Sequence, residues 1–299
     1  MGPPIPPFPA HRKQTMESSS TWSRRGTSPW SRIAQWPWWA IILVFTGLVL
    51  IYLILASKNY NETFFYLLQG VYTTLRITLF SYLIAIAIGL VVGLARVSKN
   101  VILYNLATLY VEIVRGVPMV VLLLYVAFAL FPLFVDLVQR LGVWGLTIVP
   151  GSAFFQNLTT FTIRSVPMEG RAIIALAFGY GAYEAEVFRA GIQSIGKGQM
   201  EAAKSLGMTY FQAMRFIILP QAVRRVLPPL GNDFIACLKD SSLATVLAVP
   251  ELTQLGRLRR ASTFRVLEVF NVVAFLYLAM TLLLSVAVKW LEQKMKFEE

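Results

Sequence analysis

Four consecutive polar side chains interrupt an apolar stretch late in the chain: Lys239, Asp240, Ser241 and Ser242. An ammonium, a carboxylate and two hydroxyls offer partners for both charged ends of a zwitterionic solute such as an α-amino acid. In the alternative interpretation, Lys239 pairs with a neighbouring residue and both hydroxyls bond to backbone carbonyls, so that the group is structural. The residues themselves leave both interpretations open.

Two pairs of opposite charges are spaced three residues apart: Glu112 with Arg115, and Glu186 with Arg189. This spacing places both members of a pair on one face of a helix, where they can interact. Pro118 follows the first pair and interrupts backbone hydrogen bonding, as in helices that line transport pathways. Glu112 and Arg115 therefore have two candidate roles, a structural ion pair or contact with a charged substrate. For Glu186 and Arg189 we expect a solvated pair.

A polar segment at residues 198–220, "GQMEAAKSLGMTYFQAMRFIILP", lies between strongly apolar segments. Its spacing predicts two short helices, the first ended by Gly207 and the second started by a capping box of Thr209 and Gln212. The second helix is expected to run toward Pro220. Such an elbow could dock into a groove of a partner protein, or it could be an ordinary loop on the membrane surface.

The composition is that of a membrane protein. Hydrophobic residues make up 57% of the 299 residues and charged residues 14%, which is too apolar for a soluble domain of this size. The net charge of +12 fits anionic lipid headgroups and the positive-inside rule. We therefore expect membrane lipids as partners and no nucleic acid.

The apolar segments predict about six transmembrane helices, with both termini in the cytoplasm. The predicted spans cover residues 38–56, 77–95, 101–135, 172–188, 226–249 and 269–288. The arginine-rich residues 256–265 would then lie outside, and we expect a surface helix there.

Three regions outside this core have their own interpretation. Residues 1–36 are rich in Pro, Ser and Arg and predict a disordered, basic cytoplasmic tail. Residues 37–57 predict an extra transmembrane helix, because the apolar run is long for the alternative, a cleaved signal peptide. Residues 136–169 predict an external insertion, turn-rich around Pro150 and Gly151, with a short interfacial helix.

Several kinds of chemistry are not supported. A single cysteine and a single histidine exclude an internal disulfide and argue against a His/Cys metal site. The sequence has no nucleotide-binding P-loop and no pairing of a nucleophile with a base. We therefore expect no catalytic residues, no metal and no cofactor, with any ATP bound by a separate subunit.

The elbow resembles the EAA signature of permease subunits of ABC importers. The matching residues are Glu201, Ala202, Ala203, Gly207, Ile217, Leu219 and Pro220. This resemblance implies that the elbow, residues 194–220, is a coupling helix that fits a cleft of the ATP-hydrolysing subunit. Four further motifs resemble the polar amino acid permease family: "GVYTTLRITLFSYLIAIAIGLVVGLARVS", "YVEIVRGVPMVVLLLYV", "YGAYEAEVFRAGI" and "LPPLGNDFIACLKDSSLATVLAVPEL".

The resemblance covers residues 70–296 and implies an all-α transmembrane bundle like that of type I ABC importer permeases. The implied partners are two ATP-binding subunits, an extracytoplasmic solute-binding protein and a second permease, either a copy or a paralogue. The implied location is the cytoplasmic membrane of a prokaryote. Glu184 departs from the family, which usually has an uncharged residue there, and this leaves the charge preference of the substrate open.

The expected function is import of a polar amino acid, with the substrate pathway at Lys239, Asp240, Ser241, Ser242, Glu112 and Arg115. The alternatives are an importer of another small polar solute, and a secondary transporter or channel that works without an ATPase. A membrane enzyme is a further rival, and the lack of a nucleophile paired with a base disfavours it.

Overall fold

The computed structural model describes residue 2 and residues 38–295, with the side chains of residues 197 and 295 left out. No strand occurs in residues 38–295, which confirms the all-α prediction. The predicted tail, residues 1–36, lies outside the described residues apart from residue 2. A compact unit begins at Gly47, and the packing described below lies within it.

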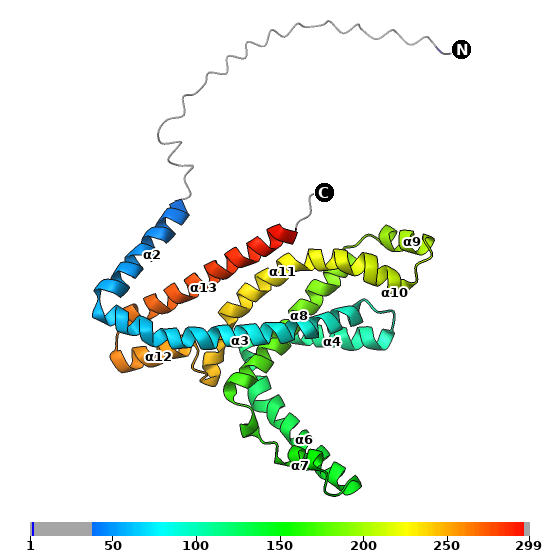
Figure 1. The fold of residues 1–299 in the computed structure, drawn as a ribbon, viewed down its shortest axis with the longest axis horizontal. Coiled ribbons are helices and arrows are strands. Elements are labelled where there is room, and N and C mark those ends of the chain that lie inside the picture. Colours follow the sequence, from blue (N-terminus) through cyan, green and yellow to red (C-terminus); the bar gives the residue numbers. More distant parts are fainter. Residues whose placement is uncertain (1, 3–37, 296–299) are drawn as a thin grey trace. The chain divides into compact units, whose positions relative to one another are not determined.

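The α-helices follow one another along the described chain (Figure 1). They are α2 (Trp38–Ala56), α3 (Lys58–Arg96), α4 (Val101–Gly116), α5 (Met119–Tyr125), α6 (Phe131–Ile148), α7 (Ala153–Thr160), α8 (Met168–Gln193), α9 (Lys197–Ser205), α10 (Tyr210–Ala213), α11 (Leu219–Asp240), α12 (Leu252–Thr263) and α13 (Val266–Met295). Short 3₁₀ segments cover Ile163–Ser165 and Ser241–Leu247, and π-helical turns cover Val126–Leu130 and Met214–Ile218.

Among the described residues, four helical stretches are long and apolar enough to cross a membrane: Trp38–Ala56, Lys58–Arg96, Met119–Ile148 and Val266–Lys294. They overlap the first, second, third and sixth predicted spans. Helices α8 and α11 lie at the two remaining spans. Both carry charged residues, which lowers their hydropathy. The chain is a membrane-embedded bundle of helices.

The predicted bounds of two spans were wrong. Helix α3 begins at Lys58, well before residue 77, because the polar residues at its start still form regular helix. The predicted span at 101–135 is two helices, since the chain leaves the helical conformation at Val117 and Pro118. The second of these helices continues past residue 135 and ends at Ile148.

Each π-helical turn ends two residues before a proline. The turn at Val126–Leu130 precedes Pro132, and the turn at Met214–Ile218 precedes Pro220. Proline lacks an N–H and its ring crowds the preceding turn, so the chain widens locally while the helix continues. The helix that starts at Tyr210 therefore runs to Pro220, as predicted, and continues beyond it as α11.

Helices α3 and α8 pack closely because glycines remove side chains from the contact. A Cβ on Gly93 would lie 2.8 Å from Cβ of Phe188, and a Cβ on Gly89 would collide with Cβ of Glu184. Small residues at such contacts let backbones approach within a membrane. This interface is the scaffold that positions the other helices.

Helices α12 and α13 pack against the first half of α3. Gly70 leaves room for the backbone of Leu252, whose N–H donates a hydrogen bond of 3.2 Å to Thr74 Oγ1. The buried carboxylate of Glu251 caps α12 by accepting from the backbone N–H groups of Thr253 at 2.8 Å and Gln254 at 2.7 Å. Burial raises the pKa of Glu251, and these hydrogen bonds oppose that shift.

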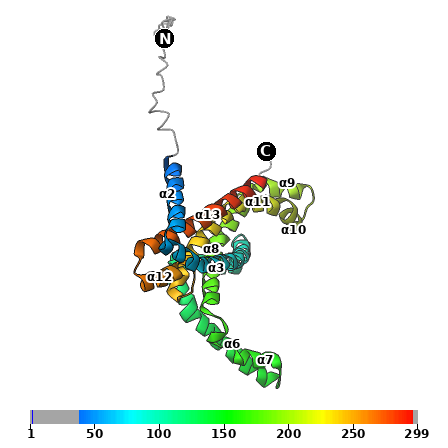
Figure 2. The ribbon, with the colours of Figure 1, turned by 60° about the vertical axis from the view of Figure 1, so that its left-hand side comes forward.

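The insertion at residues 136–169 is mostly helical. Helices α6 and α7 form a hairpin, which Figures 1 and 2 both show as two adjacent helices. The chain reverses at Gly151, which has a φ of +80°. A Cβ on Gly142 would lie 2.8 Å from the backbone nitrogen of Thr159, so glycine permits the close contact. The predicted turn at Pro150 and Gly151 is present. The helix α6 before this turn is longer than the short helix that was expected in this region.

Candidate functional site

The elbow begins with α9 and turns at Gly207. This residue has a φ of +79°, a left-handed conformation that glycine adopts without strain. Its N–H donates to the carbonyl of Lys204 at 2.9 Å, and the N–H of Met208 donates to the carbonyl of Ala203 at 3.1 Å. These bonds form the predicted C-terminal cap.

The second helix of the elbow starts with the predicted capping box. The N–H of Thr209 donates to Gln212 Oε1 at 2.8 Å, and the N–H of Gln212 donates to Thr209 Oγ1 at 3.3 Å. Because the helix runs without a break into α11, the elbow is mechanically joined to a helix of the bundle. A hydrogen bond from Arg225 to the carbonyl of Ser194 also links α11 to the segment before α9.

The predicted coupling residues divide by exposure. Glu201, Ala202, Gly207 and Pro220 are exposed, Ile217 and Leu219 are half-buried, and Ala203 is buried. Neighbouring apolar side chains are also exposed: Leu206 is 81% and Phe211 is 71% accessible. A carboxylate beside exposed apolar groups suits a surface that a partner protein covers.

A cluster of charges joins the ends of α3, α4 and α8. Glu186 is its centre: its carboxylate lies 2.5 Å from Arg96 and 4.0 Å from Arg115, and accepts from Arg189 Nε at 3.1 Å. Glu186 pairs with Arg189 as predicted, but the pair is half-buried in a network with Arg96 and Arg115 and is not the solvated pair expected.

The predicted pair within α4 does not form. Glu112 lies 3.7 Å from Arg96 instead, and Arg115 contacts Glu186 on another helix. The guanidinium of Arg115 also lies 5.4 Å from the ring centroid of Tyr183. Tertiary packing therefore places these two predicted pathway residues in an ion network between helices. Their role toward a substrate stays a prediction.

The structure separates the four polar residues at the end of α11. Asp240 Oδ2 accepts a hydrogen bond of 2.9 Å from the hydroxyl of Tyr180 on α8. Ser241 is fully buried and its hydroxyl donates to the carbonyl of Leu238 at 2.7 Å, as in the structural interpretation. Lys239 is exposed and Ser242 is half-buried. Asp240 is the charged member of this group that contacts a neighbouring helix of the bundle.

Sequence reasoning singled out Glu184 as a departure from the family but did not group it with Asp240, and it missed Tyr180 and Asp233. Tyr180 and Glu184 are one turn apart on α8, and Asp233 precedes Asp240 by two turns on α11. Glu184 is fully buried. Tyr180 and Glu184 are four residues apart, and Asp233 and Asp240 are seven apart, so each pair lies on one face of its helix. This spacing is a signal that could have identified them as two polar helix faces.

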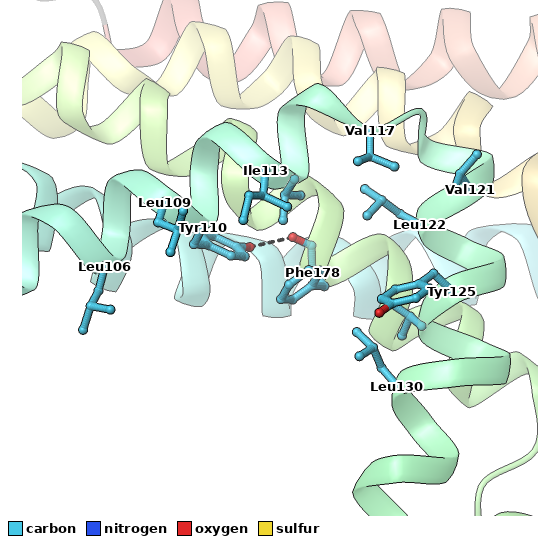
Figure 3. Close-up of a pocket in the computed structure, with 12 residues that line it drawn as sticks. Leu106, Leu109, Tyr110, Ile113, Val117, Val121, Leu122, Tyr125, Leu130 and Phe178 are labelled. Carbon is cyan, nitrogen blue, oxygen red and sulfur yellow. Dashed lines mark hydrogen bonds between the residues drawn. The ribbon is translucent and has the colours of Figure 1, made fainter.

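A largely apolar cavity of about 500 Å³ opens between α4, α5 and α8 (Figure 3). Figure 3 draws a hydrogen bond between two residues of its lining, which the Tyr110 hydroxyl donates to the carbonyl of Phe178 at 2.6 Å. Leu106, Ile113 and Leu130 line the remaining wall. Such a lining offers no group to bind a polar solute, so the charged residues described above are the candidate pathway.

Comparison with known proteins identifies relatives over most of the chain. Residues 85–297 match the family described as binding-protein-dependent transport system inner membrane component. A glutamine transport system permease protein of Escherichia coli (strain K12) is 36% identical over 230 residues, which cover 77% of this chain and 93% of the relative. A nopaline transport system permease protein of Agrobacterium fabrum is 35% identical over 241 residues, which cover 79% of this chain and 91% of the relative.

Solved structures agree with the fold. A crystal structure of an amino acid ABC transporter with histidines matches with 32% identity and a TM-score of 0.63, covering 81% of this chain and 98% of that chain. A methionine ABC transporter in an inward-facing conformation matches with 21% identity and a TM-score of 0.58, covering 78% of this chain and 97% of that chain. The second likeness concerns the fold alone.

Proposed function

The chain belongs to the family of binding-protein-dependent transport system inner membrane components, and on this premise we propose that it is the permease subunit of an ATP-driven importer of a polar amino acid. The relatives named for glutamine and nopaline transport, and the structure of an amino acid transporter with histidines, support this class of substrate.

The elbow is the observation that carries the proposal. It presents Glu201 and exposed apolar side chains on two short capped helices, and it is continuous with α11. A secondary transporter or channel has no use for a rigid lever of this kind. The elbow therefore favours coupling to a separate ATP-hydrolysing subunit, in line with the lack of a P-loop in this sequence.

The proposed assembly contains two ATP-binding subunits, an extracytoplasmic solute-binding protein and a second permease, either a copy or a paralogue. ATP would be bound by the partner subunits alone. We place the complex in the cytoplasmic membrane of a prokaryote with both termini in the cytoplasm, and assign residues 70–296 to the permease domain.

Within this proposal Asp240 is the acceptor for the α-ammonium group of the substrate, because its carboxylate is half-buried between α8 and α11 and lies 2.9 Å from the hydroxyl of Tyr180. Asp240→Asn should weaken uptake much more than ATP hydrolysis by the assembled complex. Loss of the folded complex would instead assign the residue a structural role.

The test of function is uptake by proteoliposomes that contain the complete complex. Labelled amino acids should accumulate only when the solute-binding protein, the ATP-binding subunit and ATP are all present. Accumulation by the permease without the ATP-binding subunit would favour a secondary transporter. Uptake of other small polar solutes, with none of any amino acid, would exclude the proposed substrate class.

A further inference from the structure

Helices α8 and α11 face each other with polar side chains. Tyr180 and Glu184 lie one turn apart on α8, and Asp233, Cys237 and Asp240 follow one face of α11 at spacings of four and three residues. The hydrogen bond between Tyr180 and Asp240 shows that the two faces meet. Cys237 lies between the two aspartates in sequence and is fully buried, and all three carboxyl groups lie close enough to act on its thiol. We call Glu184, Asp233 and Asp240 the carboxyl seam.

Glu184 is the most unusual member of the carboxyl seam. It is 0% accessible, and neither of its carboxyl oxygens has a hydrogen-bond partner. The nearby Tyr82 hydroxyl donates to the carbonyl of Leu230 at 2.5 Å instead. Burying a charged carboxylate without a donor or a counter-charge costs several kcal/mol, so Glu184 is either kept protonated or paired with a partner that the chain itself does not supply.

The carboxyl seam also lacks a cation. None of the ion pairs found in residues 38–295 includes Glu184, Asp233 or Asp240. Lys239, the adjacent base in sequence, is exposed. The charged group of α11 that acts on Glu184 is Asp233, which has the same sign.

The partner expected from this arrangement is an elongated organic cation. In the described part of the chain, no group of three or more His, Cys, Asp or Glu side chains is arranged to hold a metal ion. An organic cation with a guanidinium or ammonium group on a flexible chain can instead pair with carboxylates that lie at different positions along the seam. The rings of Tyr82 and Tyr180, whose centroids are 6.4 Å apart in an edge-to-face arrangement, lie beside the same seam.

We propose that Glu184 and Asp233 of the carboxyl seam bind the cationic side chain of a basic amino acid during transport while Asp240 accepts its α-ammonium group, with Glu184 as the residue that selects a positive side chain. The inference rests on the proposed function and narrows its substrate class. Because Glu184 is inaccessible in this conformation, α11 must move relative to α8 before the substrate binds. The elbow is continuous with α11, so it is the element through which ATP hydrolysis would drive this movement.

The test uses the full-length permease in complex with its ATP-binding subunits, without the solute-binding protein, so that only the permease selects. Equilibrium binding of labelled arginine and labelled glutamine is measured on the detergent-solubilised complex. The unmodified complex should bind arginine more tightly. Glu184→Gln should raise the Kd for arginine at least about tenfold, equivalent to about 1.4 kcal/mol, and leave the Kd for glutamine nearly unchanged.

Asp136→Asn is the matched control, because it neutralises an exposed carboxylate that pairs with Arg140 in the α6–α7 hairpin. Arginine binding by this variant should equal that of the unmodified complex. Asp233 is only partly buried, so Asp233→Asn tests the same seam if Glu184→Gln fails to fold. It should also weaken arginine binding selectively.

A preference of the unmodified complex for glutamine would overturn the inference, as would unchanged arginine binding in both seam variants. Uptake by the complete complex separates this failure from failure of the proposed function. If glutamine enters in an ATP-dependent manner while arginine is not bound, only the inference about the carboxyl seam falls. If no amino acid is taken up, the proposed function falls with it.

Discussion

Gly89 shows how a single residue controls the close contact between α3 and α8. A Cβ at this position would collide with Cβ of Glu184 and lie 2.9 Å from its carbonyl carbon, so α3 and α8 would have to separate. Gly89→Ala should lower the stability of the purified protein by about 1–3 kcal/mol, the usual range for overpacking. The measurement is thermal unfolding in detergent.

Gly116→Ala is the control for this substitution, because a Cβ at Gly116 meets nothing within 4 Å. Its melting temperature should match that of the unmodified protein. Equal melting temperatures for both variants would mean that the contact between α3 and α8 can relax at no cost.

Glu186 and Glu112 belong to one ion network but differ in their surroundings. The side chain of Glu186 is 27% accessible and has three arginine partners, whereas that of Glu112 is 71% accessible and has one partner at 3.7 Å. Glu186→Gln leaves several positive charges close together, and we expect a loss of about 2 kcal/mol or more. Glu112→Gln should cost less than about 1 kcal/mol, as exposed pairs do.

Denaturation of the two variants under the same conditions checks this difference. The effect of Glu186→Gln should shrink when the salt concentration is raised, because added ions screen the repulsion among the arginines. Equal losses for both variants would show that Glu186 is not the centre of the network.

Among the elements, the elbow depends most on a single backbone conformation. Gly207 has a φ of +79°, which a β-branched residue does not adopt without strain. Gly207→Val should reduce ATP-dependent uptake by about tenfold, a typical coupling energy, while the protein still inserts into the membrane. Glu201→Lys should act in the same direction, since it reverses the charge on the exposed face.

Gly198→Ala is the matched control within the same element. Gly198 lies in α9 with open space around its Cα, and alanine favours helix. Uptake by this variant should remain normal. Normal uptake by Gly207→Val and Glu201→Lys would remove the elbow from the coupling mechanism.

The elbow could be predicted from sequence because its signals are local. The C-terminal cap at Gly207 and the capping box of Thr209 and Gln212 each involve residues within one or two turns of each other. The continuation through Pro220 was missed, because a π-helical turn that accommodates a proline leaves little local signature.

The candidate pathway was only partly predictable, because its contacts join distant helices. Asp240 was identified, yet its partner Tyr180 is 60 residues away in the chain. Glu112 and Arg115 have the spacing of a helical pair, and packing of α3 and α8 against α4 gives each a different partner. Spacing within one helix cannot reveal which helix lies opposite.

On the scale of the whole bundle, the long helix α3 has the arginine-rich helix α12 near its start and the elbow near its end. Arg259 of α12 lies 3.4 Å from Glu62, near the start of α3. The elbow shares a cavity of about 560 Å³ with Arg96, at the end of α3. At a rise of 1.5 Å per residue, Glu62 and Arg96 are about 50 Å apart along α3, which is more than the thickness of a bilayer. α12 and the elbow are therefore expected on opposite sides of the membrane.

Cysteine labelling tests this topology in intact cells that carry a Cys237→Ala background, which removes the chain's only native cysteine. Ala261→Cys, on an exposed position of α12, should react with a membrane-impermeant thiol reagent added outside. Ser205→Cys, exposed at the end of α9, should react only after the membrane is permeabilised. Gly256 is unsuitable for the external label, because a Cβ there would lie 2.7 Å from Val273 Cγ2. Labelling of Ser205→Cys from outside, with protection of Ala261→Cys, would reverse the proposed orientation and place the elbow beyond the reach of any cytoplasmic ATPase.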